Sequence, residues 1–365
     1  MANALFGAAV ATVLAASAGV LPWESSDSRF EQALGPRAWV FPRDHGPHPS
    51  FAHEWWYLTG HLQTPGGERF GFELTFFRIA LPGAASEAAT GASHWRTRQM
   101  FVAHFALTEI DRQQFHSEER YARDALALSG AQSSPLRVWL DDWSLELLGT
   151  SWQLRAQQPG FALELAMTPA LAPVLNGEAG LSQKSDNPAD ASYYYSIPRL
   201  SAAGRLVRNG EPLALRGTAW LDREWGSGGL AADEAGWDWF ALQFADGSEL
   251  MFYALRRREG TRDPHSAGTW VDPEGQSRAL TDVDVRISVL QSWQSPRGGR
   301  YPARWRLDVP SLGLAVDLRP AVANQELGGR PRYWEGAVEV VGSRGTQPVA
   351  GEGYVELVGY AKPPG

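Results

Sequence analysis

The stretch RGTAWLDREWGSGGLAADEAGWDWFALQFADGSELMFYALR, residues 216–256, predicts β-strands in close succession. The first strand begins just upstream at Leu213 and ends in the polar and aromatic cluster around Asp222. Strands at 237–244 and 249–256 follow a glycine-rich segment, and an Asp-Gly turn joins them. Asp-Gly between two aromatic-rich runs is a strong signal for a β-hairpin. The stretch therefore predicts a β fold.

The composition of the 365 residues also favours β structure. The chain has 38 Gly, 24 Pro and 16 Trp, so turn residues alternate with short aromatic and β-branched runs. This pattern is typical of an all-β protein, and the length allows two domains. The net charge of −8 and the lack of a basic stripe argue against nucleic acid as a partner. Because cysteine is absent, disulfides, thiolate metal sites and a cysteine nucleophile are excluded.

The two halves of the chain contain similar segments, which indicates an internal duplication. The similar pairs are 54–78 with 237–256, 143–168 with 303–320, and 217–222 with 351–356. We therefore predict an N-terminal domain over 45–215 and a C-terminal domain over 216–365. Residues 115–132, which include YARDALALSG, predict a short helix.

The first residues predict export. Residues 2–21 are small and apolar, and Ala16-Ser17-Ala18 resembles a signal-peptidase site, although no Lys or Arg precedes the run. An N-terminal helix or a misassigned start codon are the alternatives. We predict a signal peptide over 1–22, a lead-in over 23–44, and a periplasmic or secreted protein.

Asp222-Arg223-Glu224 is the first candidate for chemistry. Three charged residues beside tryptophans are costly to bury unless they are paired. One interpretation is a carboxyl at the mouth of an apolar pocket, with a raised pKa that suits a general acid. The other is a structural ion network that closes the end of a barrel.

A second candidate is the segment that begins at His53 and Glu54. It superficially resembles the start of a zinc-protease motif, but Tyr57 occupies the place of the second histidine, so we reject that motif. The histidine spacing in the lead-in is unspecific, and no metal or cofactor is predicted. We expect His53, Glu54 and Tyr57 as polar groups at a pocket mouth.

The remaining candidates each allow a structural alternative. His104 lies in an apolar alternating strand, where a hydrogen-bonded core histidine is the commoner role. Arg78 ends an aromatic strand, where it suits an anion or a glutamate. Tyr193, Tyr195 and Arg199 are expected to line a cavity or to stiffen the domain junction. No Gly-x-Ser-x-Gly, phosphate-binding loop or dinucleotide motif is present, so a serine hydrolase is weakly supported.

Several long motifs resemble the AttH/CrtC family, which includes carotenoid 1,2-hydratases and proteins labelled as secreted hydrolases. The resemblance covers roughly residues 45–360. The motifs are HEWWYLTGHL, FGFELTFFR, AHFAL, YYYSIPRL, GTAWLDREWGS and GWDWFALQFADGSELMFYALR. The resemblance implies two lipocalin-like β-barrel or sandwich domains with apolar cavities that suit isoprenoid or lipid-like ligands.

The resemblance also implies a role for Asp222. In the hydratase branch, an aspartate at the end of this strand protonates a carbon–carbon double bond, and water captures the cation. Asp222 matches that aspartate, and Trp220 stands where that branch has an aromatic residue. Tyr193 and Tyr195 replace a histidine and a tryptophan of that branch, so the chain is closer to the AttH side.

We therefore expect an exported, monomeric protein that binds a hydrophobic small molecule or lipid and uses Asp222 for acid-catalysed hydration or isomerisation. Peripheral association with a membrane or an export system is compatible with this expectation. A non-catalytic lipid carrier is the alternative, and a hydrolase with water between Glu54 and Asp222 is the second alternative. The candidate catalytic residues are Asp222, Glu224 and Glu54. The candidate binding residues are His53, Trp56, Tyr57, Arg78, His104, Tyr193, Tyr195, Arg199, Trp220, Trp239 and Gln243.

Overall fold

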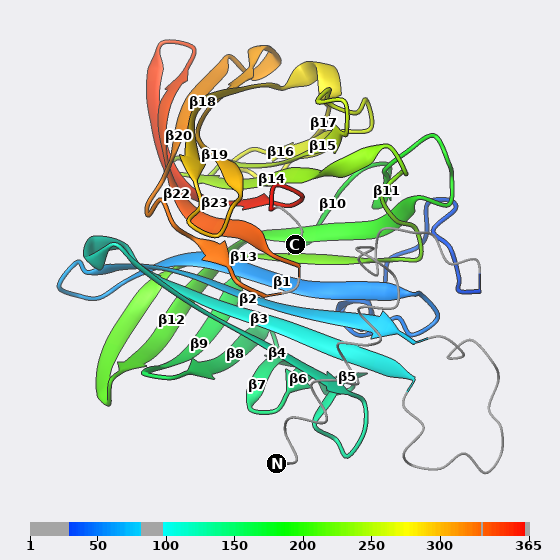
Figure 1. Ribbon diagram of the computed structural model, residues 1–365, viewed down its shortest axis with the longest axis vertical. Coiled ribbons are helices and arrows are strands. Elements are labelled where there is room, and N and C mark those ends of the chain that lie inside the picture. Colours follow the sequence, from blue (N-terminus) through cyan, green and yellow to red (C-terminus); the bar gives the residue numbers. More distant parts are fainter. Residues whose placement is uncertain (1–28, 82–97, 330, 362–365) are drawn as a thin grey trace.

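The computed structural model describes residues 29–81, 98–329 and 331–361. These residues form 23 β-strands and four short 3-10 helices, with no α-helix among them. The strands make two large antiparallel sheets that lie one above the other in Figure 1. The all-β prediction with two lipocalin-like domains is confirmed. Among the described residues, no helix is long and apolar enough to cross a membrane.

The first sheet curls into a nearly closed barrel, with strand order β4-β3-β2-β1-β13-β12-β9-β8-β7-β6-β5. Two short strands, β10 and β11, pair with β12 outside this path. Its strands are β1 (His53–Gln63), β2 (Arg69–Ala80), β3 (Gln99–Glu109), β4 (Gln114–Arg123), β5 (Ser129–Ser133), β6 (Leu136–Leu140), β7 (Trp143–Leu148), β8 (Ser151–Gln158), β9 (Phe161–Pro169), β10 (Val174–Leu175), β11 (Leu181–Gln183), β12 (Ala191–Arg208) and β13 (Glu211–Gly226).

The second sheet is a half-barrel with strand order β17-β16-β15-β14-β23-β22-β20-β19-β18, and β21 pairs with β22. Its strands are β14 (Glu234–Phe244), β15 (Glu249–Arg257), β16 (Ala267–Val271), β17 (Ser277–Thr281), β18 (Arg286–Gln294), β19 (Arg300–Val309), β20 (Leu314–Pro320), β21 (Glu326–Leu327), β22 (Tyr333–Arg344) and β23 (Gln347–Leu357). The 3-10 helices are η1 (Arg43–His45), η2 (Ile110–Arg112), η3 (Asp282–Asp284) and η4 (Pro310–Leu312).

The duplication is visible in the strand pairing. In each sheet the first long strand pairs with the next strand and with the last strand: β1 lies between β2 and β13, and β14 lies between β15 and β23. The domain boundary expected between 215 and 216 falls inside β13, which is one continuous strand of the first sheet. The chain passes from the first sheet to the second between Gly226 and Glu234.

The short helix predicted within 115–132 is wrong. Residues Gln114–Arg123 form β4, which pairs along its whole length with β3. Leu126 and Ala127 adopt left-handed backbone conformations in the turn before β5. The helix-forming residues of this segment gave a weak local preference, and pairing with the edge of the barrel overrides it.

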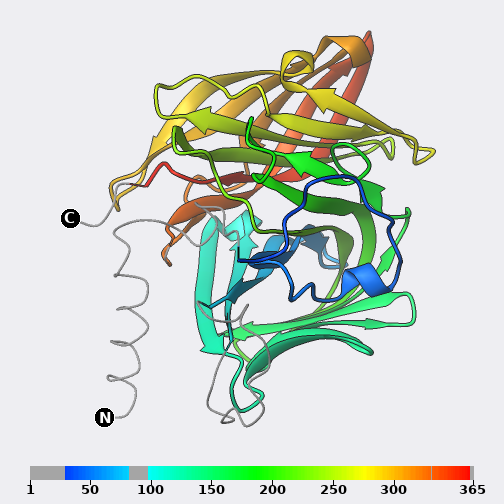
Figure 2. The same cartoon turned by 90° about the vertical axis from the view of Figure 1, so that its right-hand side faces the viewer.

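Three large apolar clusters and a small fourth one, made by Leu327, Tyr333 and Val358, account for the packing. One fills the first barrel, one fills the curve of the second sheet, and a third lies between the sheets, with Tyr57, Tyr194, Trp220, Trp239 and Tyr253 among its members. Because successive side chains of a strand point to opposite faces, the strands of the first barrel wall that meet the second sheet are buried on both sides. Figure 2 shows the two layers from the side, with the lead-in (dark blue) across the opening of the first barrel.

Candidate functional site

A mostly apolar cavity of about 130 Å³ lies between the two sheets. β1, β2, β3, β12 and β13 form its wall on the first sheet, and β14, β15, β22 and β23 form its wall on the second. The lining residues are His53, Trp55, Tyr57, Thr75, Phe77, His104, Lys184, Asp190, Ala191, Ser192, Tyr194, Asp222, Glu224, Gly228, Gly229, Leu230, Trp237, Trp239, Tyr253, Leu255, Pro331, Tyr333, Glu356 and Val358. The cavity therefore needs both domains.

The carboxyl of Asp222 in this cavity accepts three hydrogen bonds from neighbouring side chains. Its Oδ1 accepts hydrogen bonds from Ser196 Oγ at 2.5 Å and Trp220 Nε1 at 2.7 Å. Its Oδ2 accepts one from Tyr194 Oη at 2.5 Å. The strand period explains the arrangement, since Trp220 and Asp222 share a face of β13 and Ser196 is the cross-strand neighbour on β12.

The environment of Asp222 keeps its carboxyl protonated to higher pH than usual. Burial raises the pKa of Asp222 to about 7, although the three hydrogen bonds oppose this change, and the Glu224 charge adds to the increase. A carboxyl with this pKa is present in both protonation states near neutral pH. It can therefore give a proton to a bound molecule and take it back.

Beside Asp222, Lys184 and Glu224 form a partly buried ion pair. Lys184 Nζ lies 3.2 Å from Glu224 Oε1 and 2.9 Å from Ser182 Oγ, and it sits 3.9 Å from the ring centre of Tyr253. Burial alone would lower the pKa of Lys184, but Glu224 and Tyr253 outweigh it, so the pKa is raised. Lys184 is therefore a cation in the cavity wall, and sequence reasoning missed it.

The wall on the second sheet carries Glu356, which accepts a hydrogen bond of 2.9 Å from Trp237 Nε1. Burial, with the charges of Glu224 and Asp222, raises the pKa of Glu356 to about 7. The charge of Asp222 thus disfavours the ionisation of Glu356, and both carboxyls stay protonated to higher pH than usual.

Two histidines reach the cavity from the first sheet. The ring of His53 is held through Nε2, which donates to the carbonyl of Gly228 at 2.7 Å, while its Nδ1 has no partner among the described residues. Burial lowers the pKa of His53, so its imidazole is neutral. His104 lies 2.6 Å through Nδ1 from Tyr333 Oη and 3.1 Å through Nε2 from Glu119 Oε2.

Aromatic rings dominate the rest of the lining. His53 stacks on Trp55, and the ring of Tyr57 packs edge-on against Trp239, as does the ring of Trp220 from outside the lining. Tyr57 also donates its hydroxyl hydrogen to Glu335, behind the cavity wall. These faces suit an apolar ligand, and their π electrons attract positive charge.

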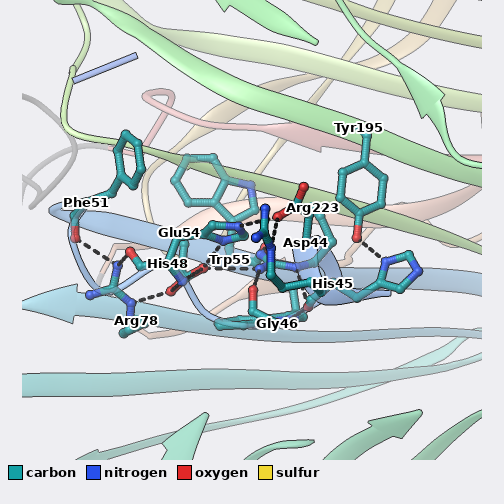
Figure 3. A network of polar contacts seen from close by, with 12 residues as sticks. Asp44, His45, Gly46, His48, Phe51, Glu54, Trp55, Arg78, Tyr195 and Arg223 are labelled. Carbon is teal, nitrogen blue, oxygen red and sulfur yellow. Dashed lines mark hydrogen bonds and ion pairs between the residues drawn. The ribbon is translucent and has the colours of Figure 1, made fainter. Parts of the chain in front are cut away.

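Five candidate residues, Glu54, Trp56, Arg78, Tyr193 and Tyr195, point into the first barrel instead of the cavity. Glu54, Trp56 and Arg78 lie on the opposite face of the sheet from Tyr57, and Tyr195 lies on the opposite face from Tyr194. Arg78 Nε donates to Glu54 Oε1 at 2.5 Å, and Arg223 Nη2 donates to Glu54 Oε2 at 3.1 Å (Figure 3). These guanidinium groups and His48 hold the pKa of Glu54 well below its usual range, although burial opposes them.

This network anchors the lead-in inside the barrel. Arg223 donates to the carbonyls of His45 and Gly46, and Tyr195 Oη lies 2.6 Å from His45 Nδ1 (Figure 3). Tyr193 donates to the carbonyl of Gly35 at 2.8 Å. The expected pocket-mouth role of Glu54 is therefore wrong in geometry, because Glu54 and Asp222 project from opposite faces of the sheet. A water molecule cannot bridge the two carboxylates there.

The last candidates lie at the junction of the sheets but outside the described cavity lining. Arg199 pairs with Glu249, and Gln243 Nε2 donates to the carbonyl of Pro198 at 2.7 Å. Trp220 contributes its indole N–H to Asp222. The candidates that do line the cavity are His53, Tyr57, His104, Asp222, Glu224 and Trp239.

Tyr194 is the important residue that sequence reasoning missed in the YYYS segment. The strand period offered the signal, because Tyr194 and Ser196 share one face of β12 while Tyr193 and Tyr195 share the other. Within the described ranges, no group of three or more His, Asp or Glu side chains is arranged to hold a metal ion.

Comparison with known proteins adds three relatives. A crystal structure of a Nitrosomonas europaea protein assigned to AttH is 35% identical with a TM-score of 0.80, over 91% of this chain and 100% of that one. Kievitone hydratase from Nectria haematococca has a similar fold, with 18% identity and a TM-score of 0.68 over 94% of this chain and 99% of that one. Dehydratase asqC of Emericella nidulans is 22% identical over 236 residues, which are 57% of this chain and 61% of that protein. The match thus spans less than two thirds of that curated relative.

The family model of AttH-like proteins matches residues 32–360. This range includes nearly all of both sheets and every residue of the cavity lining. Together with the Nitrosomonas europaea structure, the match confirms the resemblance found in the sequence motifs. The chain belongs to the AttH-like family.

Proposed function

We propose that this protein adds water to, or removes water from, a hydrophobic substrate held between the two sheets, with Asp222 as the general acid. The observation that carries the proposal is the buried carboxyl of Asp222, with a pKa raised to about 7 and three donors ready for its ionised form. The names of two relatives, a hydratase and a dehydratase, support the same class of reaction.

In the hydration direction, the Asp222 O–H bond breaks and its proton forms a C–H bond with one carbon of a double bond. The other alkene carbon becomes a cation, which the rings of Trp239 and Tyr57 stabilise. A water oxygen then bonds to this carbon and releases a proton. In the reverse direction, protonation of a hydroxyl lets it leave as water.

The three donors to Asp222 matter most after the proton has left. Tyr194, Ser196 and Trp220 already point at the carboxylate oxygens, so they stabilise the new negative charge without rearrangement. Preorganised donors of this kind lower the barrier because they act on the charge that develops in the transition state. The apolar, aromatic lining supports an isoprenoid or lipid-like substrate. An exported location stays a proposal, since residues 1–22 lie outside the described part of the chain.

The test combines extraction and isotope exchange. Organic extracts of purified wild type and Asp222→Asn are compared by mass spectrometry, and both proteins are incubated with linalool, a tertiary allylic alcohol, in H₂¹⁸O. Wild type is expected to exchange the hydroxyl oxygen, and the variant is expected to lose ~10²–10⁴-fold in rate.

Asp238→Asn is the matched control, because Asp238 is also a buried aspartate on a central strand but bonds Arg256 and Tyr360 away from the cavity. It should keep the wild-type rate. If neither wild type nor Asp222→Asn exchanges oxygen and both carry the same unmodified ligand, the protein is a carrier and the proposal fails.

A further inference from the structure

We propose that Tyr333 is a second catalytic residue, which takes the proton from the attacking water and passes its own proton through His104 to Glu119. This inference rests on the proposed function, because it supplies the base that takes the proton from the attacking water. Nothing in the mechanism above uses these three residues. Tyr333 and His104 both line the cavity, and they reach it from different sheets.

The three side chains form a continuous line from the cavity to the outer part of the barrel. Tyr333 Oη lies 2.6 Å from His104 Nδ1, and His104 Nε2 lies 3.1 Å from Glu119 Oε2. Tyr333 and His104 are buried, whereas the Glu119 side chain is 23% exposed. His104 on β3 and Glu119 on β4 are direct cross-strand neighbours, so the sheet itself positions their contact.

The hydrogen-bonding chemistry of these three side chains sets the direction of proton transfer. A carboxylate only accepts hydrogen bonds, so Glu119 fixes the imidazole proton on Nε2 and leaves the Nδ1 lone pair toward Tyr333. Burial, with the nearby charges of Glu73, Glu335, Glu356 and Glu119, raises the pKa of Tyr333 well above its usual value. The phenol is therefore protonated and donates to Nδ1. Its oxygen keeps a lone pair that can accept a proton from water.

The step balances without any added reactant. As the water oxygen bonds to the carbocation, one water O–H bond breaks and its proton binds Tyr333 Oη. The original phenol proton moves to His104 Nδ1, and the Nε2 proton moves to Glu119 Oε2. The chain then resets in the opposite direction: Glu119 returns its proton to His104 Nε2, Nδ1 returns its proton to Tyr333, and the phenol passes one proton through a cavity water to Asp222. The net change is the addition of H₂O.

The acid and the base stand on different sheets. Asp222 stands on β13 of the first sheet, and Tyr333 stands at the start of β22 of the second sheet. The acid and the base thus come from the two domains, and the Tyr333–His104 hydrogen bond crosses between the sheets. That bond is one of the contacts between the sheets, and it defines the path of the proton.

The first experiment reads the tautomer of His104 and needs no substrate. The full-length protein is labelled with ¹⁵N-histidine, and the ring nitrogens are observed by long-range ¹H–¹⁵N NMR, with His104→Gln for assignment. We expect the Nε2–H tautomer, whose Nδ1 accepts a hydrogen bond. His53 is an internal reference, because its Nε2 also donates while its Nδ1 has no partner among the described residues.

Tyr333→Phe removes only the phenol oxygen. In this variant the His104 Nδ1 resonance should move toward the unpartnered Nδ1 of His53, while the Nε2–H tautomer persists through Glu119. If His104 instead carries its proton on Nδ1, Tyr333 is an acceptor and cannot pass a proton to the ring. That result overturns the relay and leaves the role of Asp222 untouched.

The second experiment separates this inference from the proposed function. Linalool exchange in H₂¹⁸O is measured for Asp222→Asn, Tyr333→Phe and Tyr354→Phe. Tyr354 is a matched control, as it is a buried interface tyrosine on β23 outside the described cavity lining. We expect Tyr333→Phe to lose ~10²-fold or more and Tyr354→Phe to keep the rate. Loss in Asp222→Asn with a wild-type rate in Tyr333→Phe refutes the relay alone. Equal rates in wild type and Asp222→Asn refute the proposed function.

Discussion

Tyr194 Oη donates a 2.5 Å hydrogen bond to Asp222 Oδ2, and the same phenol oxygen accepts a 3.1 Å hydrogen bond from Nε1 of Trp239. Tyr194 and Asp222 belong to the first sheet, whereas Trp239 belongs to the second. The phenol thus orients the carboxyl and connects it to the opposite wall. A hydrogen bond to a charged carboxylate stabilises it by roughly 1.5–3 kcal/mol, so this contact bears directly on when Asp222 ionises.

Tyr194→Phe removes one of the three donors to Asp222 and should raise the pKa of that carboxyl further above about 7. The remaining donors, Ser196 and Trp220, both serve Oδ1, so Oδ2 is left without its partner. Oxygen exchange should then continue to higher pH, and the basic limb of the pH–rate profile should move up by about one pH unit. The pH–rate profile of the variant measures this displacement. An identical profile would show that Tyr194 does not control the ionisation of Asp222.

Asp222→Asn should change the pH dependence of stability. The pKa of Asp222 in the folded protein is about 7, above the ordinary value of 3.8, so the folded state binds this proton more tightly than the unfolded state. The stabilisation is complete below about pH 4 and is lost as the pH rises toward and beyond 7. Removal of the titrating group eliminates this loss, which amounts to at most about 4 kcal/mol.

Urea unfolding of wild type and Asp222→Asn at pH 5 and pH 8 measures the effect. As the pH rises from 5 to 8, the free energy of unfolding of the variant should increase relative to that of wild type. Glu249 and Glu356 also have raised pKa values, of about 8 and about 7. Both proteins therefore share the loss of stability with rising pH that these two groups cause. A constant difference between the two proteins would contradict the pKa of Asp222.

The sequence was a good guide to the fold because its signals are local. Asp246-Gly247 between aromatic runs gives the β14–β15 hairpin, and the similar segments give two sheets with the same pairing plan. The helix expected in 115–132 failed because edge pairing with β3 outweighs local preference. Such tertiary effects are not visible in a short window of residues.

The site was harder to predict because it depends on contacts between strands that are distant in sequence. Asp222 could be found from the cluster of charges beside tryptophans, but Tyr333 and Glu356 reach the cavity only through the packing of the second sheet on the first. Glu54 was misplaced for a simpler reason. The two-residue period of β1 puts it on the barrel face, while its neighbours His53 and Trp55 face the cavity.

Glu54→Gln should destabilise the protein without changing its chemistry. The substitution leaves the guanidinium groups of Arg78 and Arg223 buried without their anionic partner, and both residues are almost fully buried. Loss of one partner from a buried ion pair costs about 3–5 kcal/mol. Urea unfolding should show this loss, whereas the exchange rate per folded molecule should match wild type. A specific loss of rate with unchanged stability would return Glu54 to the catalytic site.

Lys184→Met should make Asp222 harder to ionise. Lys184 offsets the negative charge of Glu224, which itself raises the pKa of Asp222. Without the lysine, the Glu224 charge is less compensated, so the pKa of Asp222 should rise and the basic limb of the pH–rate profile should move up. Lys184→Arg keeps the positive charge beside Glu224 and should restore most of the wild-type profile. If Lys184→Met and Lys184→Arg give the same profile as each other, the charge at this position does not act on Asp222, and the ion pair only closes the cavity wall.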